Sequence, residues 1–175
     1  MDIVEALALI RPIPDYPKPG ILFQDITPLL ANGDAFKVVN DHLASIIDEE
    51  KLIAGIEARG FIFAAALANS TGNGFIPIRK AGKLPHKTFS QNYGLEYGTD
   101  VLEIHIDAIG VATDVLLIDD VLATGGTIEA AIELIVRAGG NVDHVVTILE
   151  IRALNGRQRL FDKFPHIRIT SLMVY

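Results

Sequence analysis

The sequence predicts an α/β protein built on an open, mainly parallel twisted sheet flanked by helices. Apolar runs of strand length alternate along the chain with segments whose apolar residues recur at helical spacing. This order is typical of right-handed strand–helix–strand crossovers. The run at 115–118 contains only Val, Leu and Ile, which is the pattern of a parallel strand buried on both faces.

Length and composition favour one well-buried domain, 1–175, because the chain has 175 residues and 50% of them are hydrophobic. A net charge of −7 disfavours nucleic acid as a partner. The chain has no cysteine, which excludes disulfides and thiolate metal sites. It has no long uncharged apolar run, and Asp2 and Glu5 do not fit the basic start of a signal peptide. We therefore expect a cytoplasmic protein that binds no membrane.

The N-terminal part is expected to contain two helices separated by an extended arm. Residues 2–10 have the pattern of a short amphipathic helix. The prolines from Pro12 to Pro19 then impose an extended, non-helical path. Asp34 is placed to cap a further helix that runs to about residue 49.

The rest of the chain is expected to supply the sheet and its crossover helices. Helices are predicted at 61–69 and 128–136, with a short segment near 158–161 and a loop or hairpin at 84–99. Strands are predicted at 52–56, 74–78, 101–106, 115–118, 142–151 and 167–173. Ligands of such sheets bind beyond the carboxyl ends of the strands, so the loops at 57–60, 79–83 and 119–127 form the candidate site.

The loop after the run at 115–118 has the composition of a phosphate-binding loop. The carboxylates Asp119 and Asp120 come where the strand is expected to end, and A-T-G-G-T follows at 123–127. Adjacent glycines let backbone N–H groups surround an anion, and the helix start adds donors and positive dipole. Because no lysine follows, the loop suits a monophosphate better than a triphosphate. A glycine pair alone would favour a tight turn; with the two carboxylates, which accept from sugar hydroxyls, it indicates a ribose 5-phosphate.

Two further loops at the same edge of the sheet carry cations. Arg59 follows one strand, and Arg79, Lys80 and Lys83 follow another. Arg59 offers bidentate recognition of phosphate oxygens, whereas lysines act as point charges. Opposite a sugar-phosphate site these cations suggest a second, highly charged phosphate group; the alternative for the basic run is a solvated turn.

The sequence resembles the adenine phosphoribosyltransferase family over nearly its whole length. V-L-L-I-D-D-V-L-A-T-G-G-T is similar to the phosphoribosyl-diphosphate motif of all type I phosphoribosyltransferases. Four other segments narrow the resemblance to the adenine enzymes: Y-P-K-P-G-I-L-F-Q-D-I-T-P, G-I-E-A-R-G-F-I-F, R-K-A-G-K-L-P and L-E-Y-G. It implies the type I phosphoribosyltransferase fold with a small N-terminal hood at about 1–33 and a flexible flap at about 84–99.

The activity implied by this resemblance belongs to purine salvage. Adenine and 5-phospho-α-D-ribose 1-diphosphate would give AMP and diphosphate through an oxocarbenium-like transition state. Mg²⁺ would be required and held mainly by the substrate, so no protein ligand is assigned to it. Members of the family are homodimers, and we expect the same here.

The resemblance also implies a role for each site residue. Phe23 would stack on adenine with Ile151 on its other face, while backbone groups of Leu22 and Gln24 read the base. The pattern alone would instead place Phe23 in the core. Glu96 in the flap would be the general acid/base; the alternative is a solvent-exposed flap residue. Arg59, which would also be catalytic and would follow a tight turn at Glu57-Ala58, would bind the diphosphate together with Arg79, Lys80 and Lys83. Asp119 and Asp120 would bind the ribose. The 5′-phosphate would be bound by Ala123, Thr124, Gly125, Gly126 and Thr127.

Three other functions share part of these features. A phosphoribosyltransferase for a 6-oxopurine or orotate is disfavoured by the hood and by the lack of a recognisable base-reading lysine near the C-terminus. A phosphoribosyl-diphosphate-sensing regulator would need a DNA-binding module, for which the N-terminal segment is too short. A flavodoxin-like binding module would not need the two basic loops.

Overall fold

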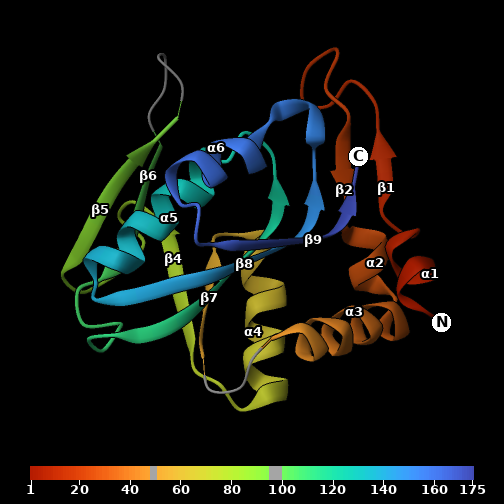
Figure 1. Cartoon of the computed structure of the whole chain (residues 1–175). Helices are drawn as coiled ribbons and strands as arrows, with labels where there is room; N and C mark the ends of the chain where they lie inside the picture. Colours follow the sequence, from red (N-terminus) through yellow and green to blue (C-terminus); the bar gives the residue numbers. More distant parts are fainter. Residues whose placement is uncertain (48–50, 95–99) are drawn as a thin grey trace. The chain divides into compact units, whose positions relative to one another are not determined.

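The computed structural model describes residues 1–47, 51–94 and 100–175. These residues fall into two compact units, Met1–Ile47 and Asp48–Tyr175, which can be followed by colour in Figure 1. The predicted hood lies within the first unit. The organisation of the chain as one domain stays a prediction.

The first unit combines a small hairpin with three helices. Strand β1 pairs antiparallel with β2, and Arg11 of β1 forms a 2.6 Å ion pair with Asp25 of β2. Ala6, Leu29, Val39 and Leu43 have no exposed surface and form the core of this unit. The elements are α1 (Ile3–Leu7), β1 (Arg11–Ile13), β2 (Phe23–Asp25), α2 (Thr27–Ala31) and α3 (Gly33–Ile46).

The predicted cap of the long helix in this unit is wrong. Helix α3 begins two residues earlier than that cap implies, at Gly33, and the Asn32 side chain accepts a hydrogen bond from the N–H of Ala35. Asn32 has the extended backbone that a capping residue needs, whereas Asp34 lies inside the first turn. Asp34 still favours the helix there, because a negative charge complements the N-terminal end of the helix dipole.

The second unit is a seven-stranded sheet in the order β5-β6-β4-β3-β7-β8-β9. The five strands from β4 to β9 in this order are parallel, and β6 and β5 extend the sheet antiparallel. The predicted mainly parallel α/β fold is therefore confirmed. The elements are β3 (Leu52–Ile56), α4 (Arg59–Thr71), β4 (Phe75–Lys80), β5 (Thr88–Tyr93), β6 (Asp100–His105), β7 (Thr113–Leu122), α5 (Gly126–Arg137), β8 (Gly140–Glu150), the 3₁₀ turn η1 (Arg152–Leu154), α6 (Gly156–Lys163) and β9 (Arg168–Val174).

The centre of the sheet holds the core. All four residues at 115–118 have 0% exposure, which confirms that β7 is buried on both faces. Helix α4 packs on β3 and β7, while α5 packs on β5, β6, β7 and β8, as Figure 1 shows. Among the described residues, no helix has both the length and the apolar character needed to cross a bilayer.

Strand β7 is longer than the sequence suggests. Asp119 and Asp120 were expected after the strand, but β7 continues to Leu122 because it stays paired with β8 as far as Glu150. The two aspartates therefore lie within the last residues of β7, and the backbone pairing with β8 fixes their positions.

Candidate functional site

Three segments that are far apart in the sequence meet at the carboxyl ends of β3, β4 and β7. They enclose a pocket of about 420 Å³. Five of the predicted site residues come together there with the predicted turn at Glu57-Ala58 and with two residues that the sequence did not single out for the site, Ile56 and Tyr93. The pocket is lined by Ile56, Glu57, Ala58, Arg59, Lys80, Tyr93, Asp119, Asp120 and Thr127.

A smaller pocket of about 100 Å³ adjoins the loop at 123–127, which is called the glycine loop below. Asp119 and Thr127 line both pockets, so the two form one connected candidate site. Gly125 has a φ of +83°, and α5 begins at the next residue. Glycine adopts this left-handed backbone conformation without strain, and the conformation turns the chain from the loop into the helix. The smaller pocket is lined by Asp119, Val121, Ala123, Thr124, Gly125, Thr127 and Ile128.

A second glycine, Gly156 at the start of α6, packs against the back of this loop. A Cβ on Gly156 would lie 2.2 Å from the carbonyl oxygen of Ala123, and one on Gly125 would lie 2.9 Å from the carbonyl oxygen of Gly156. Neither distance is compatible with a side chain. The loop therefore owes its shape to a contact between two glycines that are far apart in the sequence. The sequence analysis missed Gly156, although the Asn155-Gly156 dipeptide marks a turn.

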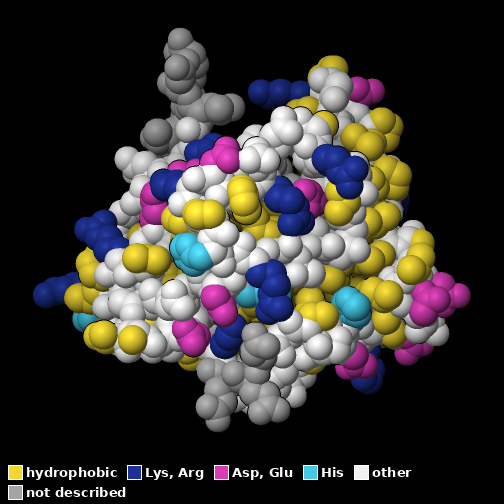
Figure 2. Space-filling model, viewed as in Figure 1, with side chains coloured by type: hydrophobic (Ala, Val, Ile, Leu, Met, Phe, Trp, Pro, Cys, Tyr) yellow, Lys and Arg dark blue, Asp and Glu magenta, His cyan; other side chains and the backbone are white. Residues whose placement is uncertain are grey.

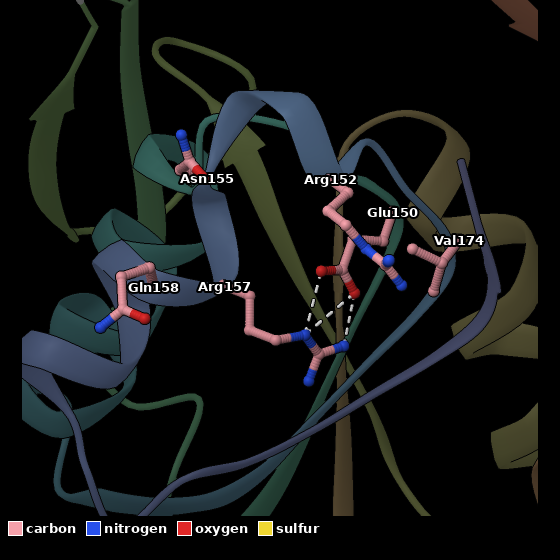
Figure 3. Close-up of a pocket in the computed structure, with 6 residues that line it drawn as sticks. All are labelled: Glu150, Arg152, Asn155, Arg157, Gln158 and Val174. Atoms are coloured by element: carbon pink, nitrogen blue, oxygen red, sulfur yellow. Dashed lines mark hydrogen bonds and ion pairs between the residues drawn. The ribbon is translucent and has the colours of Figure 1, made fainter.

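The start of α6 is fixed by an ion pair between the half-exposed Arg157 and the buried Glu150. Arg157 donates from Nε to both oxygens of Glu150, at 3.0 and 3.1 Å, and its Nη2 also contacts Glu150. Ser171 donates to the same carboxylate at 2.8 Å. Figure 3 shows Arg157 pointing toward Glu150 in the lining of a separate pocket of about 370 Å³. Because the carboxylate is 5% exposed and fully engaged, this pair serves to anchor α6 to β8.

The carboxylates of Asp119 and Asp120 are buried, with 8% and 4% exposure. Asp119 Oδ1 accepts from the N–H of Asp120 at 2.9 Å. Burial, and then the charge of Asp120, raise the pKa of Asp119 well above its usual range. Burial also raises the pKa of Asp120, although the Arg59 guanidinium opposes this with Nε 2.8 Å from Asp120 Oδ2. The pair is therefore an acidic centre that is costly to ionise.

Helix α4 brings Arg59 to this acidic centre. A Cβ on Gly60 would lie 2.9 Å from the carbonyl oxygen of Ile118 and 3.0 Å from Asp119 Oδ1, so only glycine allows the helix start to approach β7 this closely. The Glu57-Ala58 peptide before the helix is cis, which places a tight turn where one was predicted.

The basic loop after β4 is folded onto Glu57. Arg79 Nη2 donates to Glu57 Oε1, and the N–H of Lys80 donates to Glu57 Oε2, both at 2.9 Å. Arg79 also donates to the carbonyl oxygen of Lys83 at 3.0 Å. The bonds that Arg79 and then Lys80 donate to Glu57 lower the pKa of this carboxyl. Of the three predicted cations in this loop, only Lys80 is among the described residues that line the larger pocket.

Among the described residues that line the two pockets, none is one that was predicted for the base or for proton transfer. Leu22, Phe23 and Gln24 belong to the first unit, and Ile151 belongs to the second. The Phe23 ring packs edge-on against Tyr16 with centroids 5.2 Å apart, and Gln24 is buried in β2. Ile151 donates its N–H to the carbonyl oxygen of Leu122 at 2.9 Å. Glu96 lies outside the residues that the structure describes.

The charged side chains outside the site are a mixture of acidic and basic residues. On the face shown in Figure 2, basic and acidic side chains are interspersed over the surface. Several form exposed pairs, such as Lys163 with Glu129 at 2.7 Å. Pairs of this kind contribute little to stability and solvate the surface. The pockets at the ends of β3, β4 and β7 thus carry the convergent chemistry described above.

This sheet order, with an acidic pair near the end of its central strand and a glycine loop after that strand, defines a type I phosphoribosyltransferase. Residues 26–171 match the family model of the phosphoribosyl transferase domain. The adenine phosphoribosyltransferase of Parvibaculum lavamentivorans is 57% identical over 153 residues, which are 86% of this chain and 87% of the relative. That of a Roseiflexus species is 55% identical over 159 residues, 90% and 92% of the two chains. The chain belongs to the adenine phosphoribosyltransferase family.

Solved structures agree with this placement. The crystal structure of adenine phosphoribosyltransferase from Thermoanaerobacter pseudethanolicus has a TM-score of 0.92 and 46% identity, over 99% of each chain. The Saccharomyces cerevisiae enzyme, complexed with adenine and an imino-altritol bisphosphate, has a TM-score of 0.89 and 35% identity, over 97% of each chain.

Proposed function

We propose that this protein transfers the phosphoribosyl group of 5-phospho-α-D-ribose 1-diphosphate to adenine, giving AMP and diphosphate. One observation carries the proposal: the carboxylates of Asp119 and Asp120, the cations Arg59 and Lys80, and the glycine loop line one connected site. A sugar that bears a phosphate at one end and a diphosphate at the other needs these three groups in this arrangement. The complex of the yeast relative with adenine and a bisphosphate supports the choice of substrates.

The 5′-phosphate is assigned to the loop at 123–127. The smaller pocket is lined by Ala123, Thr124, Gly125 and Thr127, so hydroxyls and the N–H groups at the start of a 12-residue helix surround it. Gly126 completes the loop as the first residue of that helix. The helix dipole and the N–H donors favour a doubly charged phosphate without a lysine.

The ribose hydroxyls are assigned to Asp119 and Asp120. Ionised carboxylates accept hydrogen bonds from vicinal hydroxyls and offset positive charge on a sugar ring. Their raised pKa means that ionisation is disfavoured in the empty site. Two hydroxyl donors from the ribose favour the ionised form, so substrate binding and loss of a proton are coupled.

The leaving diphosphate is assigned to Arg59, Lys80, Arg79 and Lys83. Negative charge develops on this group as the bond to C1′ breaks, so cations placed there stabilise the transition state. Arg59 is held in position by Asp120 at 2.8 Å. Arg79 and Lys83 are bonded to each other in the basic loop, which makes Arg79 a support for the loop as well as a charge near the diphosphate.

The base is assigned to the hood. Phe23 stacks on adenine with Ile151 on the other face, and backbone groups of Leu22 and Gln24 read the 6-amino group and N1. A backbone carbonyl accepts from an amine and repels the 6-oxo group of hypoxanthine or guanine. Glu96 in the flap handles the proton that adenine loses as N9 attacks C1′.

Mg²⁺ is assigned to the substrate. No group of three acidic or histidine side chains suited to hold a metal occurs among the described residues, whereas the diphosphate offers the oxygen ligands that Mg²⁺ prefers. The buried carboxylates of Asp119 and Asp120 line the pocket and fit a divalent cation bound to the substrate nearby. The ion would neutralise charge on the leaving group.

Asp119→Asn is expected to raise stability at pH 7 while it lowers affinity for phosphoribosyl diphosphate. The pKa of Asp119 is raised in the folded protein, so this carboxyl opposes folding at pH values above its unfolded pKa, and the cost is complete above the native pKa. Asparagine lacks this cost. As the pH falls through the native pKa toward 4, the wild-type carboxyl takes up its proton and the stability difference should shrink. Denaturant unfolding of both proteins at pH 7.5 and pH 4.5 measures this. An Asn variant that is less stable at pH 7.5 would contradict it.

The reaction itself is tested by product analysis. With adenine, phosphoribosyl diphosphate and Mg²⁺, AMP and diphosphate should form in equal amounts, and a chelator should stop the reaction. Ribose 5-phosphate formed without AMP would contradict the proposal. Tight binding of phosphoribosyl diphosphate without turnover would also contradict it and would favour the phosphoribosyl-diphosphate-sensing regulator. A homodimer and a cytoplasmic location complete the proposal; sedimentation velocity tests the first.

A further inference from the structure

Tyr93 enters the larger pocket from a strand to which no role in the chemistry has been assigned. It is the last residue of β5 and lies opposite Asp100 of β6. Its side chain lines the pocket together with Asp119 and Thr127, which represent the ribose and phosphate parts of the site.

The hydroxyl of Tyr93 is surrounded by polar groups. It donates to Asp100 Oδ2 at 3.3 Å, and it also hydrogen-bonds the Thr127 side chain. Burial, and then the charge of Asp100, raise the pKa of Tyr93 to about 12. The phenol therefore stays protonated at neutral pH and keeps a hydrogen to donate.

Strand β5 holds this hydroxyl in place through contacts with α5, the helix that begins in the glycine loop. The Arg137 guanidinium of α5 lies over the Phe89 ring, 4.7 Å from its centroid, and donates to the carbonyl oxygen of Ser90 at 3.3 Å. The Tyr93 ring packs against the core of the second unit. The distance from the Tyr93 hydroxyl to the loop is thus set by packed elements.

We propose that Tyr93 is a substrate-positioning residue whose hydroxyl donates to an oxygen of the ribose 5-phosphate moiety of the substrate. The inference rests on the proposed function. The phenolic hydroxyl has a single hydrogen to donate. It donates this hydrogen to Asp100 in the free protein and to the substrate oxygen after binding. Asp100 then keeps Lys80, whose Nζ lies 3.7 Å away. A neutral donor suits this position because it holds an anionic oxygen without adding a cation beside Asp119.

Tyr93→Phe tests this directly, because it removes the hydroxyl and keeps the ring that packs on the core. Since the bond to the substrate replaces one to Asp100, we expect the Kd and KM for phosphoribosyl diphosphate to rise by about fivefold. The KM for adenine should not change, and the midpoint of thermal unfolding should fall only slightly, because the bond lost to Asp100 is long and exposed. Tyr175→Phe is the matched control. Tyr175 lies in the same unit and is 43% exposed, so the loss of its hydroxyl should leave every value unchanged.

Two outcomes would overturn the inference while the proposed function stands: unchanged affinity for phosphoribosyl diphosphate in an active Tyr93→Phe protein, or an equal loss for both substrates with a lowered unfolding midpoint. Failure of wild type to make AMP would count against the function itself. Should Tyr93→Phe fail to fold, tyrosine Cζ resonances of the wild type provide the second measurement. On addition of phosphoribosyl diphosphate, the Tyr93 signal should shift and the Tyr175 signal should not; an unmoved Tyr93 signal overturns the inference.

Discussion

Replacing Arg59 with glutamine is expected to lower kcat/KM for phosphoribosyl diphosphate by about 10²- to 10³-fold. Arg59 Nε lies 2.8 Å from Asp120 Oδ2, so the guanidinium joins the acidic centre to the diphosphate end of the pocket. Its loss removes positive charge where the leaving group becomes negative. Initial rates at saturating adenine, with phosphoribosyl diphosphate varied, measure the effect.

Arg59→Lys separates charge from geometry. Lysine keeps the charge but lacks the planar fork that binds phosphate oxygens in pairs, so its kcat/KM should lie between those of wild type and Arg59→Gln. Lys37→Gln is the control, because Lys37 forms an exposed pair with Asp41 on α3 and should have wild-type kinetics. Arg59→Gln with a kcat/KM within twofold of wild type would remove Arg59 from the diphosphate site.

Gly156→Ala is expected to lower the free energy of unfolding by about 1–3 kcal/mol and to weaken phosphoribosyl diphosphate binding. The added methyl carbon would lie 2.2 Å from the carbonyl oxygen of Ala123 and 2.9 Å from the N of Gly125. Because both contacts are backbone, the glycine loop must move away from α6. The 5′-phosphate would then meet a displaced loop. Denaturant unfolding and calorimetric titration with phosphoribosyl diphosphate measure the two effects.

Gly33→Ala is the matched control for the added methyl group. Gly33 is the first residue of α3, and nothing lies within 4 Å of a Cβ built there. Alanine at this position should leave affinity unchanged and keep or slightly raise stability, because alanine is favoured over glycine in helices. If Gly156→Ala bound phosphoribosyl diphosphate as tightly as Gly33→Ala, the contact between Gly125 and Gly156 would not govern the shape of the loop.

The parts of the fold that depend on local pattern could be predicted from the sequence. The run at 115–118 identified β7 because a strand that is buried on both faces has apolar residues at successive positions. The order of carboxylates, glycines and helix identified the loop at 123–127, because phosphate binding needs these groups next to one another in the chain. The end of β7 could not be found in this way, because pairing with β8 extends the strand through Asp119 and Asp120.

Contacts between distant positions account for what the sequence did not predict. Arg79 looked like a free cation, but its partner Glu57 lies 22 positions earlier. Gly156 and Tyr93 reach the site through the packing of α6 and β5, and neither leaves a periodic pattern. Asn32 replaced Asp34 as the helix cap because the backbone conformation at the helix start decides between two good capping residues. The roles of the hood residues and of Glu96 stay predictions.

Base selectivity tests the central claim most directly. We would measure kcat/KM for adenine and for hypoxanthine, with phosphoribosyl diphosphate and Mg²⁺ saturating. The account predicts a preference for adenine on the order of 10⁴-fold, because a 6-oxo group faces a backbone carbonyl and leaves it unpaired. Comparable turnover of the two bases would contradict the assignment of Leu22, Phe23 and Gln24 to the base, even if the phosphate loop and the acidic pair were correct.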